Sequence, residues 1–248
     1  MDAKDDLRDR IRDGLPAGVL ALMDEIEAFA GVQIVFAHNP YPPSPGAFAP
    51  LAAQVAVRHD VATIYLRDLE RTDAQNVAHE LLHIQRYWVD RVPQLRPKTD
   101  RIPALLKYIQ TLENEIEHAA IIPRERTLGL VDESCQHWNA TAAKKWGEYP
   151  WFQIHDAPSR RDYAIFGRLQ LETVTDASTR ASAFEIIKRE GVSNDAERFT
   201  KEMMALLHDK PRSASCVARY LDIPANDLRL LYFDVPNRAF RFEPLPPH

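Results

Sequence analysis

Apolar residues recur at two different spacings in the first half of the chain, and each spacing predicts its own kind of element. Residues 5–30 follow the helical period, with a break expected near Pro16. Short apolar runs predict three strands, at 32–37, 53–57 and 62–66. Prolines cluster in 39–50 and 89–103, so we expect these two segments to be loops.

A helix with a marked apolar stripe is predicted between Thr72 and Trp88. The residues of the stripe are three or four positions apart and are Val77, Leu81, Ile84 and Trp88. Thr72 is a favourable N-cap, and Gln75 three residues later completes a capping box. We expect the stripe to face a core, so that His79 and His83, which lie off its centre, face a cleft.

The second half of the chain is predicted to be mostly helical. A helix from about Ile102 to Ile122 has a regular apolar face, formed by Leu105, Ile109, Leu112 and Ile116. Further helices are expected near 125–146, 158–174, 178–190, 195–208 and 213–231. The last thirty residues or so have a less regular pattern.

The stretch from His79 to His83 has the pattern HExxH, which carries the strongest chemical signal in the sequence. Residues four apart lie on one face of a helix, so both imidazoles can reach one zinc ion. Glu80 lies on a neighbouring line of the same helix, close enough to hold a water bound to that ion. Metal-dependent peptidases use this arrangement. The alternative is an ordinary helix with two incidental histidines.

A catalytic zinc site needs a third protein ligand, and the sequence does not single one out. Cys135 and Cys216 are isolated and form no metal-binding pair. The extended motif HExxHxxGxxH requires glycine and histidine at the positions that Arg86 and Val89 occupy. The third ligand must therefore come from elsewhere in the chain.

The helix predicted at 102–122 offers the best candidates. At about 100° per residue, Glu113 and Glu115 fall on opposite borders of the apolar face, and Glu117 lies further towards solvent. His118 stands one turn after Glu115, where it could orient that carboxylate or donate a hydrogen bond to an oxyanion. Glu115 is the favoured ligand on this basis, while Glu113, Glu117 and His118 stay open as alternatives.

These motifs resemble the gluzincin branch of the zincin metallopeptidases. In that branch the HExxH helix is followed by a second helix with a glutamate ligand, often preceded by asparagine, and Asn114-Glu115 matches this feature. Ala119-Ala120-Ile121-Ile122-Pro123 is similar to the end of the glutamate helix in compact bacterial ImmA/IrrE-like metallopeptidases. The resemblance covers roughly residues 20–125.

The resemblance implies an α+β fold. Residues 1–125 would form a zincin-like core, with a small, mostly antiparallel sheet, the HExxH helix and the glutamate helix. The strand at 62–66 would line the cleft and pair with an extended substrate. Residues 126–248 would form a mainly helical region packed on this core, which need not be a separate domain.

The resemblance also implies a zinc-dependent metallopeptidase that hydrolyses a specific protein or peptide. His79, His83 and Glu115 would hold one zinc ion per chain. Glu80 would be the general base for the attacking water, and His118 is the first candidate for stabilising the oxyanion.

Two other classes of function remain as alternatives. One is a regulatory or binding protein on a zincin scaffold without turnover. The other is a DNA-linked regulator that acts through 213–231, because residues 215–229 loosely resemble a helix-turn-helix. Few positive charges lie on the second helix of that motif, which disfavours this alternative.

Composition limits the partners more than it limits the reaction. A net charge of −5 argues against broad binding of nucleic acid or an anionic membrane. Two cysteines form no disulfide framework, and the charged N-terminus has no following apolar signal region, so we expect a cytoplasmic protein. The expected partner is a protein or peptide substrate, with a regulatory protein as a further candidate.

Overall fold

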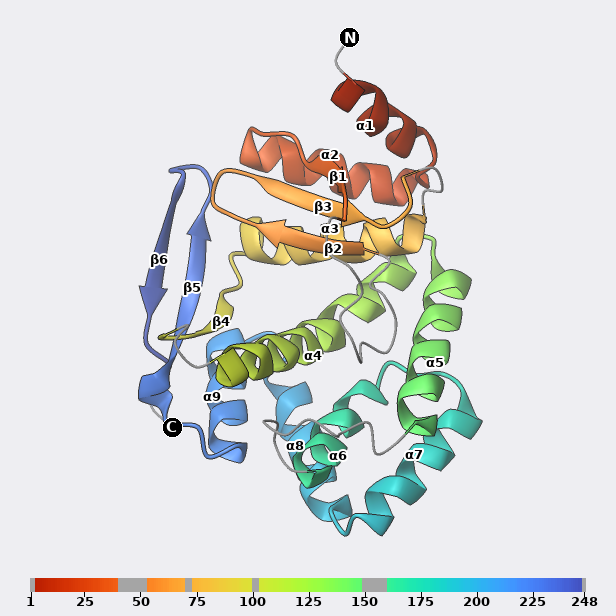
Figure 1. Ribbon diagram of the computed structural model, residues 1–248, viewed down its shortest axis with the longest axis vertical. Coiled ribbons are helices and arrows are strands. Elements are labelled where there is room, and N and C mark those ends of the chain that lie inside the picture. The colour runs from red at the N-terminus through yellow and green to blue at the C-terminus, as the bar shows by residue number, and fades with distance from the viewer. Residues whose placement is uncertain (1–2, 40–52, 70–72, 100–102, 149–159, 247–248) are drawn as a thin grey trace. The chain divides into compact units, whose positions relative to one another are not determined.

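Segments that lie far apart in the sequence come together in two units of the chain. Figure 1 labels the helices and strands. A computed structural model describes residues 3–39, 53–69, 73–99, 103–148 and 160–246. The first unit consists of Met1–Val92, Arg124–Ser134 and Tyr232–Arg241, and the second of Pro93–Pro123, Cys135–Leu231 and Phe242–His248. Compactness does not establish independent folding, so the domain boundary after residue 125 stays a prediction.

Two helices begin the first unit, α1 (Ala3–Asp13) and α2 (Ala17–Ala30), with the predicted break at Pro16 between them. Gly31 ends α2 with a φ of 65°, a left-handed conformation in which other residues are strained. In this conformation its N–H donates to the carbonyl of Glu27 at 2.8 Å, which closes the last turn of the helix.

The sheet of the first unit contains β1 (Val35–His38), β2 (Ala53–Val57) and β3 (Ala62–Leu66) in the order β1-β3-β2. The strands predicted at 53–57 and 62–66 are confirmed with the same bounds. β1 runs parallel to β3 and β2 runs antiparallel to it, so this sheet is mixed where a mostly antiparallel one was expected. The coarser prediction of an α+β chain is confirmed.

The HExxH helix, α3 (Ala74–Trp88), contacts α2, β2 and β3. Its predicted apolar stripe is confirmed, because all four residues are fully buried: Val77, Leu81, Ile84 and Trp88. The predicted N-cap is wrong. Asp73 caps the helix, since its carboxylate accepts hydrogen bonds from the N–H groups of Gln75 at 3.1 Å and Asn76 at 3.2 Å. Thr72 itself lies outside the described residues.

Helices dominate the rest of the chain, as the sequence predicts. They are α4 (Pro103–Thr127), α5 (Val131–Gly147), α6 (Arg160–Gln170), α7 (Ala177–Arg189), α8 (Ser193–Ala205) and α9 (Lys210–Tyr220). In the second unit α6, α7 and α8 pack on one another, and α9 contacts α8. α4 continues past Pro123, so the helix predicted from residue 125 begins only at Val131.

A second sheet forms from three strands that the sequence did not predict. β4 (Gln94–Pro97), β5 (Leu228–Asp234) and β6 (Ala239–Glu243) are ordered β4-β5-β6, with β4 antiparallel to β5. A short 3₁₀ turn at Ala225–Asp227 leads directly into β5. The second helix of the suspected helix-turn-helix therefore does not form, which removes the structural basis for DNA binding through 213–231. Within the described ranges, every helix is too short or too polar to cross a membrane.

Candidate metal centre

Two histidines of α3 meet with their outer ring nitrogens facing each other. His79 and His83 are one helical turn apart, both are buried, and their Nε2 atoms lie 3.2 Å apart. The two rings meet edge to face, with centroids 4.8 Å apart and an interplanar angle of 87°. The spacing of the HExxH motif accounts for this pairing, because residues four apart are neighbours on a helix.

The separation of the two nitrogens fits a zinc ion. Zinc binds imidazole nitrogen at about 2.0–2.1 Å, and two nitrogens 3.2 Å apart subtend about 100° at an ion placed at that distance. This angle is close to tetrahedral. Without an ion, the same distance allows one Nε2–H to donate to the lone pair of the other ring. The two nitrogens thus suit a metal ion, and without one they are placed to share a hydrogen bond.

A buried carboxylate orients His79 from behind. Glu125, on the last turns of α4, is fully buried, and its Oε1 lies 2.6 Å from Nδ1 of His79. The same carboxylate accepts hydrogen bonds from Nε2 of Gln75 at 3.2 Å and Oγ of Ser134 at 2.7 Å. An ionised carboxylate only accepts hydrogen bonds, so Nδ1 of His79 carries a proton beside it, and Nε2 is the nitrogen left to bind a metal ion.

Glu125 was missed by the sequence analysis. It stands 46 positions after His79 and beyond the expected end of its helix, so no local pattern connects the two residues. Metal-binding histidines commonly donate their second ring nitrogen to such a carboxylate. A search for a glutamate near the end of the following helix could have named it as a candidate.

The charges around His79 favour its protonated form when no cation is bound. Burial lowers the pKa of His79, but the hydrogen bond to Glu125 and the negative charges of Glu80 and Glu125 outweigh burial. The pKa of His79 therefore lies above its ordinary value. A metal ion must displace this proton before it can bind.

Glu80 is a buried acid whose pKa lies near neutral pH. Burial raises its pKa from 4.5 to about 7, against the opposing influence of His79 and of a hydrogen bond from the backbone of Val55 in β2. A base works best when its pKa lies near the working pH. The position of Glu80 between α3 and β2 follows from the packing of the HExxH helix on the sheet.

A third imidazole comes from α4. His118 precedes Glu125 by seven residues, which is two helical turns along the same face of one helix. One nitrogen from each of His79, His83 and His118 lies within 4.8 Å of the other two. The described residues therefore contain three histidines close enough to bind one metal ion. His118, which we expected to stabilise an oxyanion, lies in this group of three histidines.

The three α4 glutamates considered as ligands are paired with lysines. Glu115, the favoured ligand, binds Nζ of Lys145 at 2.8 Å, and it is not part of the histidine group. Glu113 and Glu117 both bind Lys210. The expectation that Glu117 lies towards solvent is wrong, because it is fully buried against a lysine of α9.

The strand expected to line the cleft is not at the edge of its sheet. β3 has β1 on one side and β2 on the other, so both of its edges are already paired. A substrate strand cannot add to it. Among the strands that the structure describes, β2 lies at an edge of this sheet and contacts α3, and the backbone of its Val55 forms a hydrogen bond with Glu80.

Comparison with known proteins finds no matching family model, no matching curated protein and no matching solved structure.

Proposed function

We propose that this protein is a zinc-dependent peptidase whose metal ion is held by His79, His83 and His118. The observation that carries the proposal is the arrangement of the HExxH pair, with Nε2 atoms 3.2 Å apart, a third imidazole within 4.8 Å and a buried glutamate in the same motif. Three protein ligands leave one position of a tetrahedral zinc ion open, as catalysis requires.

The proposal assigns a role to each side chain. A zinc ion in this site would polarise the peptide carbonyl and lower the pKa of a bound water towards neutrality. Glu80 accepts the proton of the attacking water and passes it to the leaving amine, for which a pKa of about 7 is well suited. Glu125 fixes the ring of His79. The nitrogen of His118 that binds the ion cannot also donate a hydrogen bond to an oxyanion. We therefore propose His118 as a metal ligand in place of its expected role in stabilising the oxyanion.

The substrate we propose is an extended segment of protein that pairs with the outer edge of β2. An edge strand presents unpaired backbone N–H and C=O groups, which can extend the sheet by one strand. Val55 of β2 contacts Glu80, so a peptide paired there would run past the general base. Pairing with a strand requires a peptide backbone, so this arrangement favours a protein segment over a small molecule as the substrate.

The test is cleavage by zinc-loaded protein of a complex peptide mixture, with products identified by mass spectrometry. Glu80→Gln is the matched variant, because it keeps the size of the side chain and should retain zinc. Cleavage by the wild type and none by the variant supports the proposal. Full activity of Glu80→Gln would remove the general-base role, and no cleavage by loaded wild type would favour a scaffold without turnover.

A further inference from the structure

The histidine that joins the metal group follows three glutamates on the same helix, and each of the three is engaged by a lysine. The glutamates are Glu113, Glu115 and Glu117, all within five residues of His118. Carboxylate oxygens are good ligands for many divalent cations, yet none of these three carboxylates belongs to the histidine group. The pairing with lysines is therefore a chemical feature that needs an explanation.

Lys145 binds Glu115, the glutamate that shares a helix face with His118. Glu115 and His118 are three residues apart on α4, which makes them neighbours on one face, with Cβ atoms about 5–6 Å apart. α5 meets this face at two points: Trp138 contacts the ring of His118 at 5.0 Å, and Lys145, two turns later, binds Glu115 at 2.8 Å. Both partners of the ion pair are largely shielded from water.

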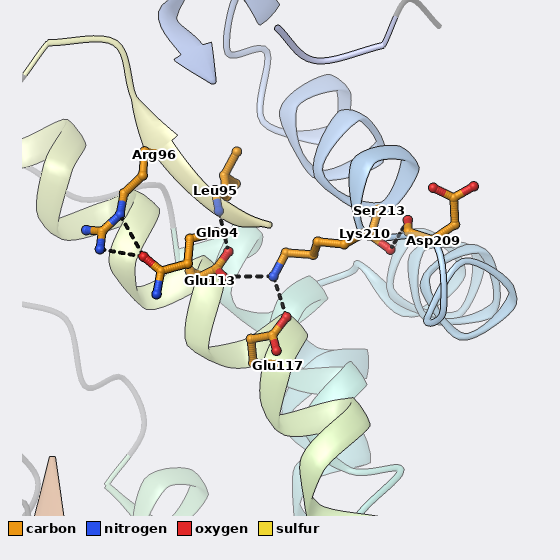
Figure 2. A network of polar contacts seen from close by, with 8 residues as sticks. All are labelled: Gln94, Leu95, Arg96, Glu113, Glu117, Asp209, Lys210 and Ser213. Carbon is orange, nitrogen blue, oxygen red and sulfur yellow. Dashed lines mark hydrogen bonds and ion pairs between the residues drawn. The ribbon is translucent and has the colours of Figure 1, made fainter. Parts of the chain in front are cut away.

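Lys210 engages the other two glutamates in a buried network (Figure 2). Its Nζ lies 2.9 Å from Glu113 and 2.5 Å from Glu117. Glu113 also accepts a hydrogen bond from the N–H of Leu95 in β4 at 3.0 Å, so its carboxylate faces β4 and α9. Burial raises the pKa of Glu113, and the positive charge of Lys210 opposes that rise.

We propose that Lys145 is a specificity-determining residue of the metal centre: by binding Glu115, the carboxylate on the same face of α4 as His118, it restricts the ligands to imidazoles. This inference rests on the proposed metal centre and adds the class of ion it selects. Imidazole ligands suit zinc and its neighbours among the transition metals, whereas carboxylate oxygens suit manganese, magnesium and calcium. Lys145 thus favours zinc over the harder cations.

A double-mutant cycle on Lys145 and Glu115 tests the inference. The four proteins are the wild type, Lys145→Met, Glu115→Gln and the double variant, and the affinities of Zn²⁺ and Mn²⁺ are measured for each by chelator competition. This pair lies closer to the surface than Lys210, so its variants are the better choice for a folded protein. Lys145→Arg is the control that keeps the positive charge.

The four proteins are expected to differ in their affinities for Zn²⁺ and Mn²⁺ in a set way. Glu115→Gln alone leaves both affinities unchanged, because Glu115 does not bind the ion. Lys145→Met releases Glu115 and raises the affinity for Mn²⁺ on the order of tenfold relative to Zn²⁺, since one oxygen ligand becomes available. The double variant and Lys145→Arg return to the wild-type ratio. If the ion pair were purely structural, the metal preference of Lys145→Met would not depend on Glu115.

Other outcomes contradict the inference in recognisable ways. An unchanged metal preference in folded Lys145→Met shows that the lysine does not restrain the ligand set. A loss of zinc affinity in Glu115→Gln alone shows that Glu115 is itself a ligand. Wild-type protein that binds neither cation overturns the metal centre and the proposed function together, and this result is distinct from the other two.

Discussion

Replacing Glu80 by glutamine should stabilise the protein in the absence of metal, and the effect should depend on pH. Glu80 is buried, and its pKa is raised from 4.5 to about 7, so the folded state binds the proton of this carboxyl more tightly than the unfolded state. Stability is therefore favoured at low pH and is lost as the pH rises from about 4.5 through 7. Glutamine resembles the protonated acid and is free of this loss.

The expected gain in stability follows from the pKa shift of Glu80. A difference of 2.5 pKa units, from 4.5 to about 7, corresponds to roughly 3 kcal/mol at a pH well above 7. Glu80→Gln should therefore be more stable than the wild type by up to about 3 kcal/mol at pH 8.5 and nearly equal to it at pH 4.5. Bound zinc should reduce the difference, because a cation beside Glu80 offsets the cost of its buried charge.

The assay is urea unfolding of metal-free protein across this pH range, with free energies from linear extrapolation. Glu148→Gln, at an exposed position, is the matched control for loss of one negative charge. Equal differences between Glu80→Gln and the wild type at pH 4.5 and 8.5 would refute the reasoning, because Glu80 would then ionise without a penalty from burial.

Three further predictions follow from the site and its support. Glu125→Gln should weaken zinc binding by about 10–100-fold in a chelator competition, because the ring of His79 loses its charged acceptor; unchanged affinity would contradict the orienting role. Zinc affinity should fall by at least about tenfold per pH unit on acidification below the raised pKa of His79, since the proton of His79 must leave for the ion to bind and any proton on the other two imidazoles must leave as well; titrations independent of pH would contradict this. Gly18→Ala should cost about 1–3 kcal/mol of unfolding free energy, because its Cβ would lie 2.7 Å from the carbonyl oxygen of Leu128, while Gly147→Ala, with open space around it, should cost nothing; equal stabilities of the two variants would argue against that close approach.

Local patterns in the sequence predicted the elements that depend on local interactions. The stripe of α3 and the two runs that form β2 and β3 were located correctly, because period and length both distinguish helix from strand there. β5 was assigned to a helix, since Leu228-Arg229-Leu230-Leu231 fits either period and its pairing with β4 joins residues 131 or more positions apart. Only the folded chain decides between these two structures.

The same distinction applies to the candidate site. His79 and His83 are neighbours by helix geometry alone, so the motif was sufficient to bring them together. The choice among Glu113, Glu115, Glu117 and His118 depends on lysines of α5 and α9, which lie 30 to 97 positions away in the chain. A helical projection treats the solvent side of α4 as open, and it therefore placed Glu117 on the wrong side.

The most direct test of the account is the zinc content of His118→Ala, measured beside the wild type and Glu115→Ala after reconstitution and removal of unbound metal. The account predicts about one zinc ion per chain in the wild type and in Glu115→Ala, and little or none in His118→Ala. Retention of zinc by His118→Ala together with its loss from Glu115→Ala would contradict the assignment of three histidines as ligands.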